Sequence, residues 1–151
     1  MQYKYMDGEN LDFIGLSHLL DEHLNQIVGG EQNRIQYIPY NQLNGIQDVI
    51  LAYDDVIPIG CASFRYYSDK VAEVKRVFVK DAYRGRGISK KIMNLLEQRA
   101  KDKGFNKFIL ESGYPLIVAM HLYRSLGFKV MPNYGVYKDM VDSICMEKII
   151  R

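Results

Sequence analysis

Four consecutive residues near the middle of the chain, Arg84-Gly85-Arg86-Gly87, have the composition of an anion-binding turn. Glycines let the backbone curl and let a ligand approach closely, and guanidinium groups match the geometry of phosphate oxygens. If a helix begins directly after them, its unpaired N–H groups and positive dipole end face the same anion. This stretch, the RGRG loop, therefore predicts a pyrophosphate site. The alternative is an ordinary tight turn with solvated arginines, because short glycine patterns are common.

The segments on either side of the RGRG loop predict the strand and the helix that such a site requires. Residues 71–80 (VAEVKRVFVK) concentrate valine and phenylalanine, which favour a strand. Residues 88–103 predict a helix, because apolar residues recur at helical spacing; they are Ile88, Ile92, Leu95, Leu96 and Ala100. Gly104 would end this helix, and residues 107–112 (KFILES) predict another strand. A strand, a helix and a strand in this order predict a β-α-β unit whose two strands are parallel.

The remainder of the chain predicts further strands and helices separated by turn residues. A short opening strand is expected to precede a helix that Asn10 caps and that Gly29-Gly30 ends. The irregular stretch 31–47 fits either a binding loop or a poorly ordered connector, with a short helix near residues 40–44. The other predicted elements are strands over residues 48–53, 57–67, 128–130 and 142–149, and a helix between Pro115 and Gly127.

Composition and charge narrow the class of protein. At 151 residues, 48% hydrophobic and 25% charged, the chain is expected to form one domain over residues 1–151. The formal net charge of +2 gives no indication of a nucleic-acid partner. There is no membrane-spanning apolar run and no apolar signal core, so we expect a cytoplasmic protein that does not engage a membrane. Cys61 and Cys145 lack a metal-ligand spacing, so we expect reduced, buried cysteines and no metal.

Two further stretches combine with the RGRG loop into the pattern of a known family. Residues 122–128 read LYRSLGF, and residues 110–113 read LESG at the end of the strand before them. From residue 48 to residue 149 the chain resembles the GCN5-related N-acetyltransferases. Residues 84–89 (RGRGIS) are similar to their pyrophosphate loop R/Q-x-x-G-x-G/A, and LYRSLGF is similar to their LYxxxGF helix end. Ser89 departs from the Gly or Ala that the family prefers, and Ser112 stands in what is often Glu-Thr-Gly.

The resemblance implies a fold and a cofactor. The fold is α/β (α+β), with a mixed, mostly antiparallel sheet of six to seven strands, about four flanking helices and a central splayed pair of parallel strands. The cofactor is acetyl-CoA, whose pantetheine arm would bind the main chain of Val77, Phe78 and Val79 as an added strand does. The side chains of Val77 and Val79 would equally fit an ordinary hydrophobic core, because this assignment concerns only their backbone. The resemblance assigns the pyrophosphate to Arg84, Gly85, Arg86, Gly87, Ile88 and Ser89.

The implied reaction is direct attack of a primary amine on the acetyl thioester within a ternary complex. It needs a neutral amine, a donor for the developing oxyanion and a proton for the leaving sulfur. By resemblance Tyr123 supplies this proton and a backbone N–H near Val77 or Val79 is the oxyanion donor. The apolar helix stripe that Tyr123 shares would alone favour a core aromatic.

For the catalytic base the sequence leaves three alternatives open: Glu73, Glu111 and a chain of water molecules. Glu73 has the same parity as Val77 and Val79 on its strand, so its side chain would face the cleft. Glu111 lies near the splayed end of the next strand. Either carboxylate would alternatively bind a cationic acceptor or pair with a neighbouring lysine or arginine.

The acceptor is expected to be a small-molecule or peptide amine. The loops 31–47 and 131–140 would line its pocket, and their residues Tyr37, Tyr40 and Tyr134, with Glu111, are the predicted contacts. The alternative is that these loops contain tyrosines only because the whole chain is rich in them, with 12 in total. We expect a monomer or a homodimer. The alternative function is a catalytically silent, CoA-binding regulatory module. The hairpin strands before the RGRG loop disfavour a nucleotide binder of the Rossmann type.

Overall fold

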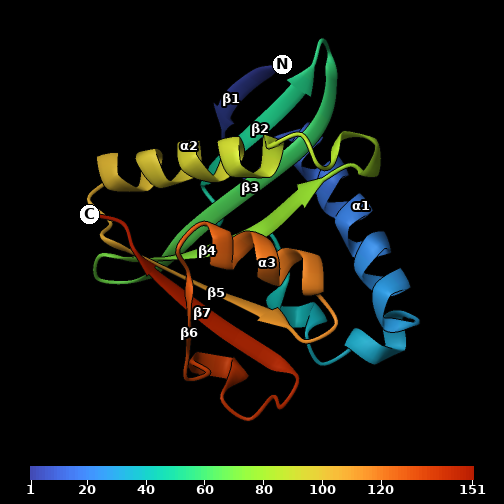
Figure 1. The fold of residues 1–151 in the computed structure, drawn as a ribbon, viewed down its shortest axis with the longest axis vertical. Coiled ribbons are helices and arrows are strands. Elements are labelled where there is room, and N and C mark those ends of the chain that lie inside the picture. Colours follow the sequence, from blue (N-terminus) through green and yellow to red (C-terminus); the bar gives the residue numbers. More distant parts are fainter.

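The computed structural model describes residues 1–151 and consists of a seven-stranded sheet with three α-helices (Figure 1). The strands are β1 (Gln2–Met6), β2 (Asp48–Asp54), β3 (Ile57–Ser68), β4 (Val71–Val79), β5 (Lys107–Gly113), β6 (Lys129–Met131) and β7 (Ser143–Ile149). The helices are α1 (Leu11–Val28), α2 (Ile88–Asp102) and α3 (Ile117–Ser125). Single 3-10 turns are η1 (Glu31–Arg34), η2 (Ile38–Tyr40), η3 (Asp81–Tyr83) and η4 (Gly135–Tyr137). The strand order is β1-β2-β3-β4-β5-β7-β6.

The predicted mixed, mostly antiparallel sheet is confirmed. Only the β4–β5 pair is parallel, as the predicted β-α-β unit requires. There are three α-helices where the family resemblance implied about four. The short helix predicted near residues 40–44 is wrong, because the chain makes the 3-10 turn η2 and leaves helical geometry after Tyr40. Pro39 suits only the first turn of a helix, and the polar residues that follow offer no apolar stripe.

Helix α1 covers one face of the first half of the sheet. The side chain of Asn10 accepts hydrogen bonds from the N–H groups of Asp12 and Phe13, and Gly29 ends the helix in a left-handed conformation with φ of 84°. A buried apolar cluster joins this helix to the sheet; it includes Phe13, Leu16, Leu20, Val49, Leu51 and Phe78. These contacts fix α1 beside β4. None of the three helices combines the length and the hydropathy that a membrane span requires.

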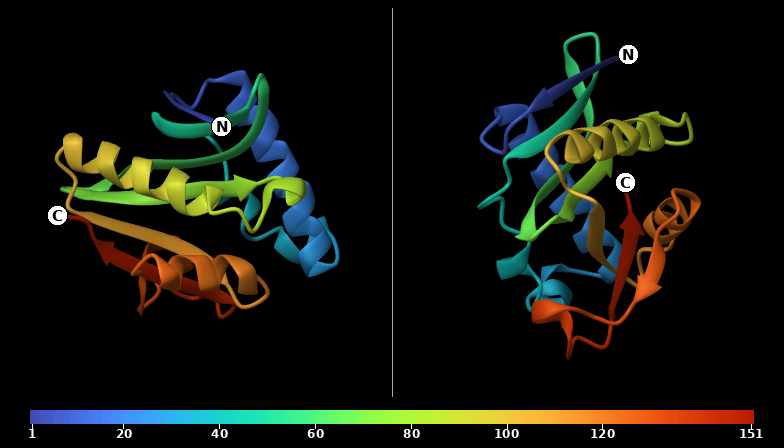
Figure 2. Two further views of the ribbon diagram at one scale, coloured as in Figure 1. Left: turned by 45° about the horizontal axis from the view of Figure 1, so that its top comes forward. Right: turned by 90° about the vertical axis from the view of Figure 1, so that its left-hand side faces the viewer.

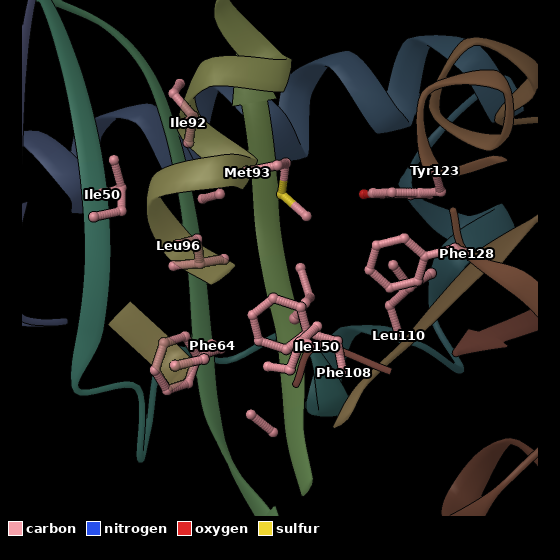
Figure 3. Packing of buried hydrophobic residues seen from close by; sticks show 14 of the residues in the cluster. Ile50, Phe64, Ile92, Met93, Leu96, Phe108, Leu110, Tyr123, Phe128 and Ile150 are labelled. Atoms are coloured by element: carbon pink, nitrogen blue, oxygen red, sulfur yellow. The ribbon is translucent and has the colours of Figure 1, made fainter. Parts of the chain in front are cut away.

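Helices α2 and α3 cover the opposite face (Figure 1). The apolar stripe of α2 is buried as predicted at Ile88, Ile92, Leu96 and Ala100. It belongs to a core that also contains Ile50, Phe64, Phe108, Tyr123 and Phe128 (Figure 3). Burial of one Ile, Leu or Phe side chain contributes about 1.5–3 kcal/mol. The buried stripe of α2 therefore holds the N-terminus of this helix at a fixed position on the sheet.

The two halves of the sheet separate between β4 and β5. Parallel pairing joins residues 71–73 to residues 107–109 and stops there. Beyond this point β4 stays paired with β3, and β5 stays paired with β7, so the two strands diverge (Figure 2, left). This is the splayed parallel pair that the family resemblance implied. It leaves the facing backbone edges of residues 74–79 and 110–113 without a strand partner.

Candidate active site

A cleft of about 1000 Å³ opens where β4 and β5 diverge. Its walls come from α1, the loop after α1, β4, β5, and the N-terminal ends of α2 and α3. Most of the residues predicted from the sequence line it, namely Tyr37, Val77, Phe78, Val79, Arg84, Gly85, Gly87, Ile88, Ser89, Glu111 and Tyr123. Four predicted residues do not line it: Tyr40, Glu73, Arg86 and Tyr134.

The RGRG loop leads into α2 with the geometry of an anion site. Gly85 and Gly87 have φ of +77° and +76°, a region that L-residues with side chains rarely adopt. A Cβ placed on either glycine would meet no heavy atom within 4 Å, so the space in front of both is open. Gly87 is the N-cap of α2 and provides no side-chain acceptor, which leaves the first N–H groups of the helix available. An anion can therefore reach the backbone here.

Side chains on both sides hold the RGRG loop in place. Arg84 donates from Nε to the carbonyl of Val79 (2.9 Å) and pairs with Asp81 (2.7 Å). Tyr83, just before the loop, donates to the carboxylate of Asp54 (2.7 Å) at the β2–β3 turn. The guanidinium of Arg86 lies 5.3 Å from the centroid of the Tyr83 ring and is exposed. Arg84 therefore orients the loop, and Arg86 is free to contribute charge from outside the cleft.

A β-bulge in β4 decides which side chains reach the cleft from each face of the sheet. The β3–β4 register shifts between Cys61 and Ser63, and Arg76 takes a left-handed φ of 57°. The extra residue reverses the alternation of side chains. Val79 packs into the core under α2, whereas Phe78 packs against α1. Lys75 and Arg76 consequently both project from the α1 face of the sheet.

This bulge corrects the prediction that Glu73 faces the same way as Val77 and Val79. Glu73 is 2% exposed and lies on the opposite face, where it accepts hydrogen bonds from Tyr134 (2.5 Å) and from Nε of Arg65 (3.0 Å). Parity counted along the sequence fails because the bulge inserts one residue between Glu73 and Val77. The hydroxyl of Tyr134, one of the predicted acceptor contacts, is therefore occupied by Glu73.

Lys75 connects this buried network to the cleft. Its Nζ donates to the carbonyl of Tyr40 (2.9 Å) and to the hydroxyl of Tyr137 (3.2 Å), and it lies 3.7 Å from Oε1 of Glu73. Burial lowers the pKa of Lys75, while the charge of Glu73 opposes this change. Tyr40, predicted as an acceptor contact, thus acts through its backbone by holding Lys75. Of this network only Lys75 lines the cleft, on the α1 face of the sheet.

Glu111 lies in the cleft on the same face as Lys75. Ser143 donates from its hydroxyl to Oε2 of Glu111 (2.8 Å), and the hydroxyls of Ser143 and Tyr37 lie 3.2 Å apart. Burial raises the pKa of Glu111 to about 7, against the opposing effects of the Ser143 hydrogen bond and the charge of Lys75. A carboxyl group with a pKa close to neutrality exchanges protons readily at physiological pH.

Tyr123 approaches the cleft from the other face of the sheet. It is 8% exposed, packs edge-on against Phe128 with ring centroids 5.7 Å apart, and points its hydroxyl away from α3 toward β4 (Figure 3). Burial is the main cause that raises the pKa of Tyr123. The phenol is therefore protonated at neutral pH. Tyr123 and Glu111 thus line one cleft from opposite faces of the sheet.

Several polar residues of the cleft were not predicted as site residues. Arg34, Lys75 and Arg76 all line the cleft, as does Asp142 at its rim. Lys75 and Arg76 did carry a signal, because adjacent charges inside a strand expected to be buried require partners. Arg34 stood in an irregular loop and had no such signal.

Comparison with known proteins places this geometry in context. The profile of the Acetyltransferase (GNAT) family matches residues 17–128. The chain is 26% identical to an IAA acetyltransferase of Azospirillum brasilense, over 85% of this chain and 84% of that protein. It is 36% identical to human N-acetyltransferase 8, over 40% of this chain but only 27% of that protein. Its fold superposes on PaiA N-acetyltransferase of Thermoplasma acidophilum in complex with coenzyme A, with a TM-score of 0.73, 22% identity and 99% coverage of both chains.

Proposed function

This chain belongs to the Acetyltransferase (GNAT) family, and we propose that it transfers the acetyl group of acetyl-CoA to a primary amine by direct attack within a ternary complex. The observation that carries the proposal is the placement of the RGRG loop, Tyr123 and Glu111 around one cleft. A site for an anionic cofactor, a proton donor and a proton acceptor thereby share one cleft of about 1000 Å³.

The residues around the cleft fit acetyl-CoA. The uncapped start of α2 and the open space before Gly85 and Gly87 suit its pyrophosphate. The unpaired edge of β4 at Val77 and Val79 suits the amide groups of its pantetheine arm. Ser89, the departure from the family pattern, lines the cleft beside the loop and adds a hydroxyl there. When bound, acetyl-CoA supplies an acetyl group activated as a thioester.

Glu111 is the base in this proposal. Its carboxylate accepts a proton from the ammonium group of the acceptor and so produces the neutral amine that attacks. Because the pKa of the Glu111 carboxyl is raised, it lies closer to the pKa of an amine, which reduces the free-energy cost of this proton transfer. The hydrogen bond from Ser143 fixes the orientation of the carboxylate. Both carboxylate oxygens of Glu73 already accept hydrogen bonds, one from Arg65 and one from Tyr134. Glu73 therefore stabilises the neighbouring Lys75 and is not the base in this proposal.

Tyr123 is the proton donor to the sulfur that leaves. Its phenol points from α3 toward β4 (Figure 3), and Tyr123 lines the same cleft as Glu111. The phenol is protonated throughout the neutral pH range, so Tyr123 has a proton to give. The acid and the base therefore act from two faces of the sheet.

The test is acetyl-CoA-dependent release of thiol in the presence of a panel of primary amines, with the acetylated product identified by mass spectrometry. Thermal unfolding with acetyl-CoA, CoA and ATP should precede it. A ligand at about a hundred times its Kd stabilises a protein by about 2.7 kcal/mol, and we expect this with both CoA species but not with ATP. Binding without any amine-dependent release of thiol would instead indicate the CoA-binding regulatory module.

A further inference from the structure

We propose that the acceptor amine carries a carboxylate close to its amino group, as an α-amino acid does, and that Lys75 binds this carboxylate. The inference rests on the proposed function and concerns the acceptor end of the same cleft. It follows from the charges that the β4 bulge and the loop after α1 bring to that end.

Three buried cations line the acceptor end. Arg34, Lys75 and Arg76 are 6%, 8% and 7% exposed, and all three border the cleft. The bulge is the reason that Lys75 and Arg76 project from the same face, although they are neighbours on a strand. Buried cations are costly unless anions compensate them.

The chain supplies too few anions for these cations. Asp21 pairs with both Arg34 (3.5 Å) and Arg76 (2.9 Å), and its side chain is 46% exposed. Glu73 is likewise shared, between Arg65 (3.0 Å) and Lys75 (3.7 Å). The three buried cations, together with the partly exposed Arg65, thus share two carboxylates.

The two other carboxylates of the acceptor end do not remedy this shortage. Asp142 is exposed at the rim, where water screens its charge. Glu111 faces the ammonium of the acceptor and becomes neutral when it takes the proton. A carboxylate on the acceptor restores the balance of charge, whereas an acceptor with several amino groups adds to the excess.

Lys75 is the cation that is positioned to bind this carboxylate. An ammonium group has three N–H donors, and Nζ uses two of them on the carbonyl of Tyr40 and the hydroxyl of Tyr137. The separation of 3.7 Å from Glu73 is too long for a hydrogen bond, so one donor remains. Arg76, by contrast, donates to the carbonyl of Ser17 (2.5 Å) and to Asp21, and its Nε is enclosed by protein atoms.

Lys75 and Glu111 each lie two residues beyond the paired residues Glu73 and Ile109, on neighbouring strands, and both line the cleft. An amino group bound at Glu111 and a carboxylate bound at Lys75 must therefore be near neighbours in the acceptor. The substituents of one α-carbon meet this requirement. Leu24, Ile27 and Val28 of α1 line the cleft as well and favour an apolar side chain.

The experiment compares acceptors that share a side chain and differ in the carboxylate, with kcat/KM expressed per neutral amine because the amino pKa differs among them. The first series is L-leucine, L-leucinamide and 3-methylbutylamine, and the second is L-phenylalanine, L-phenylalaninamide and 2-phenylethylamine. We expect the kcat/KM of the amino acid to exceed that of the amine by about tenfold or more, the usual range for a hydrogen bond between charged groups. A ratio of one or below in both series would overturn the inference.

Lys75→Met tests the assignment to this side chain, and Lys75→Arg is the matched control that keeps the charge. We expect the ratio between amino acid and amine to fall toward one in Lys75→Met, mainly through KM, and to remain above one in Lys75→Arg. Because the readout is a ratio within one variant, an altered pKa of Glu111 affects both acceptors equally. An undiminished ratio in Lys75→Met would refute the role of Lys75.

The same experiment separates this inference from the proposed function. Acetyl-CoA affinity, measured by calorimetry for each variant, reports whether the cofactor site is intact. Transfer to amines without a carboxylate preference would contradict the inference and leave the proposed function standing. Binding of acetyl-CoA without transfer to any of the six acceptors would contradict the inference as well. Failure of the wild-type protein to bind acetyl-CoA would contradict the proposed function itself.

Discussion

Replacing Glu111 by Gln should impair catalysis and stabilise the fold at the same time. Burial raises the pKa of this carboxyl from 4.5 to about 7. At about 1.4 kcal/mol per pKa unit, ionised Glu111 costs the folded protein about 3 kcal/mol at most. Glutamine has nearly the same shape, carries no charge, and keeps a carbonyl oxygen that accepts the hydrogen bond from Ser143.

The pH dependence of this stabilisation has a definite sign. Because the folded-state pKa is raised, neutral Glu111 contributes stability that is fully present below about pH 4.5. That contribution is lost as the pH rises through about 7. Glu111→Gln should therefore match the wild type near pH 4.5 and exceed it above pH 8. Removing a general base should lower kcat/KM by about 10²–10⁴ and abolish the rise of activity through about pH 7.

The assay is urea unfolding of both proteins at pH 5 and pH 8.5, together with kcat/KM profiles over the same range. The free energy of unfolding of the variant, relative to wild type, should increase between the two pH values by up to about 3 kcal/mol. An equal difference at both pH values would refute the buried, ionising Glu111 described here. Wild-type activity in Glu111→Gln would refute its role as the base.

Three further substitutions test separate parts of the structure. Tyr123→Phe should lower kcat, measured by steady-state kinetics, about a hundredfold, with little change in the acetyl-CoA affinity measured by calorimetry. An unchanged kcat would exclude the phenol as proton donor. Glu73→Gln should have the opposite effect on stability to Glu111→Gln and lower the free energy of unfolding by about 3 kcal/mol, because Arg65 and Lys75 lose their shared carboxylate. Increased stability in urea would contradict this. Asn10→Ala should lower the free energy of unfolding by about 1 kcal/mol through loss of the α1 cap, and an unchanged urea midpoint would show that the cap contributes nothing.

Most of the fold could be predicted because local signals and burial agree. The valine-rich strand, the RGRG loop and the apolar stripe of α2 each indicate the element that the structure contains. The capping residue of α1 and its terminating glycine were equally clear. The family resemblance added the splay between β4 and β5, which no local pattern contains.

The face from which each side chain of β4 projects could not be predicted. The bulge requires Arg76 at positive φ, and nothing in the residues VKRV indicates this, because arginine rarely adopts that conformation. In the structure Arg76 donates hydrogen bonds to the carbonyl of Ser17 and to Asp21 on α1, which are tertiary contacts that no local pattern indicates. For the same reason the environments of Glu73, Lys75 and Tyr134 became apparent only in the structure.

The measurement that tests the central claim most directly is a calorimetric titration of acetyl-CoA into the wild-type protein, Gly87→Val and Gly104→Val. Gly104 is the matched control, because it also has positive φ and open space around its Cβ position but does not line the cleft. We predict that the wild type and Gly104→Val bind one equivalent, and that Gly87→Val loses binding because its side chain occupies the space before α2. Unchanged affinity in Gly87→Val would contradict the assignment of the RGRG loop to the pyrophosphate.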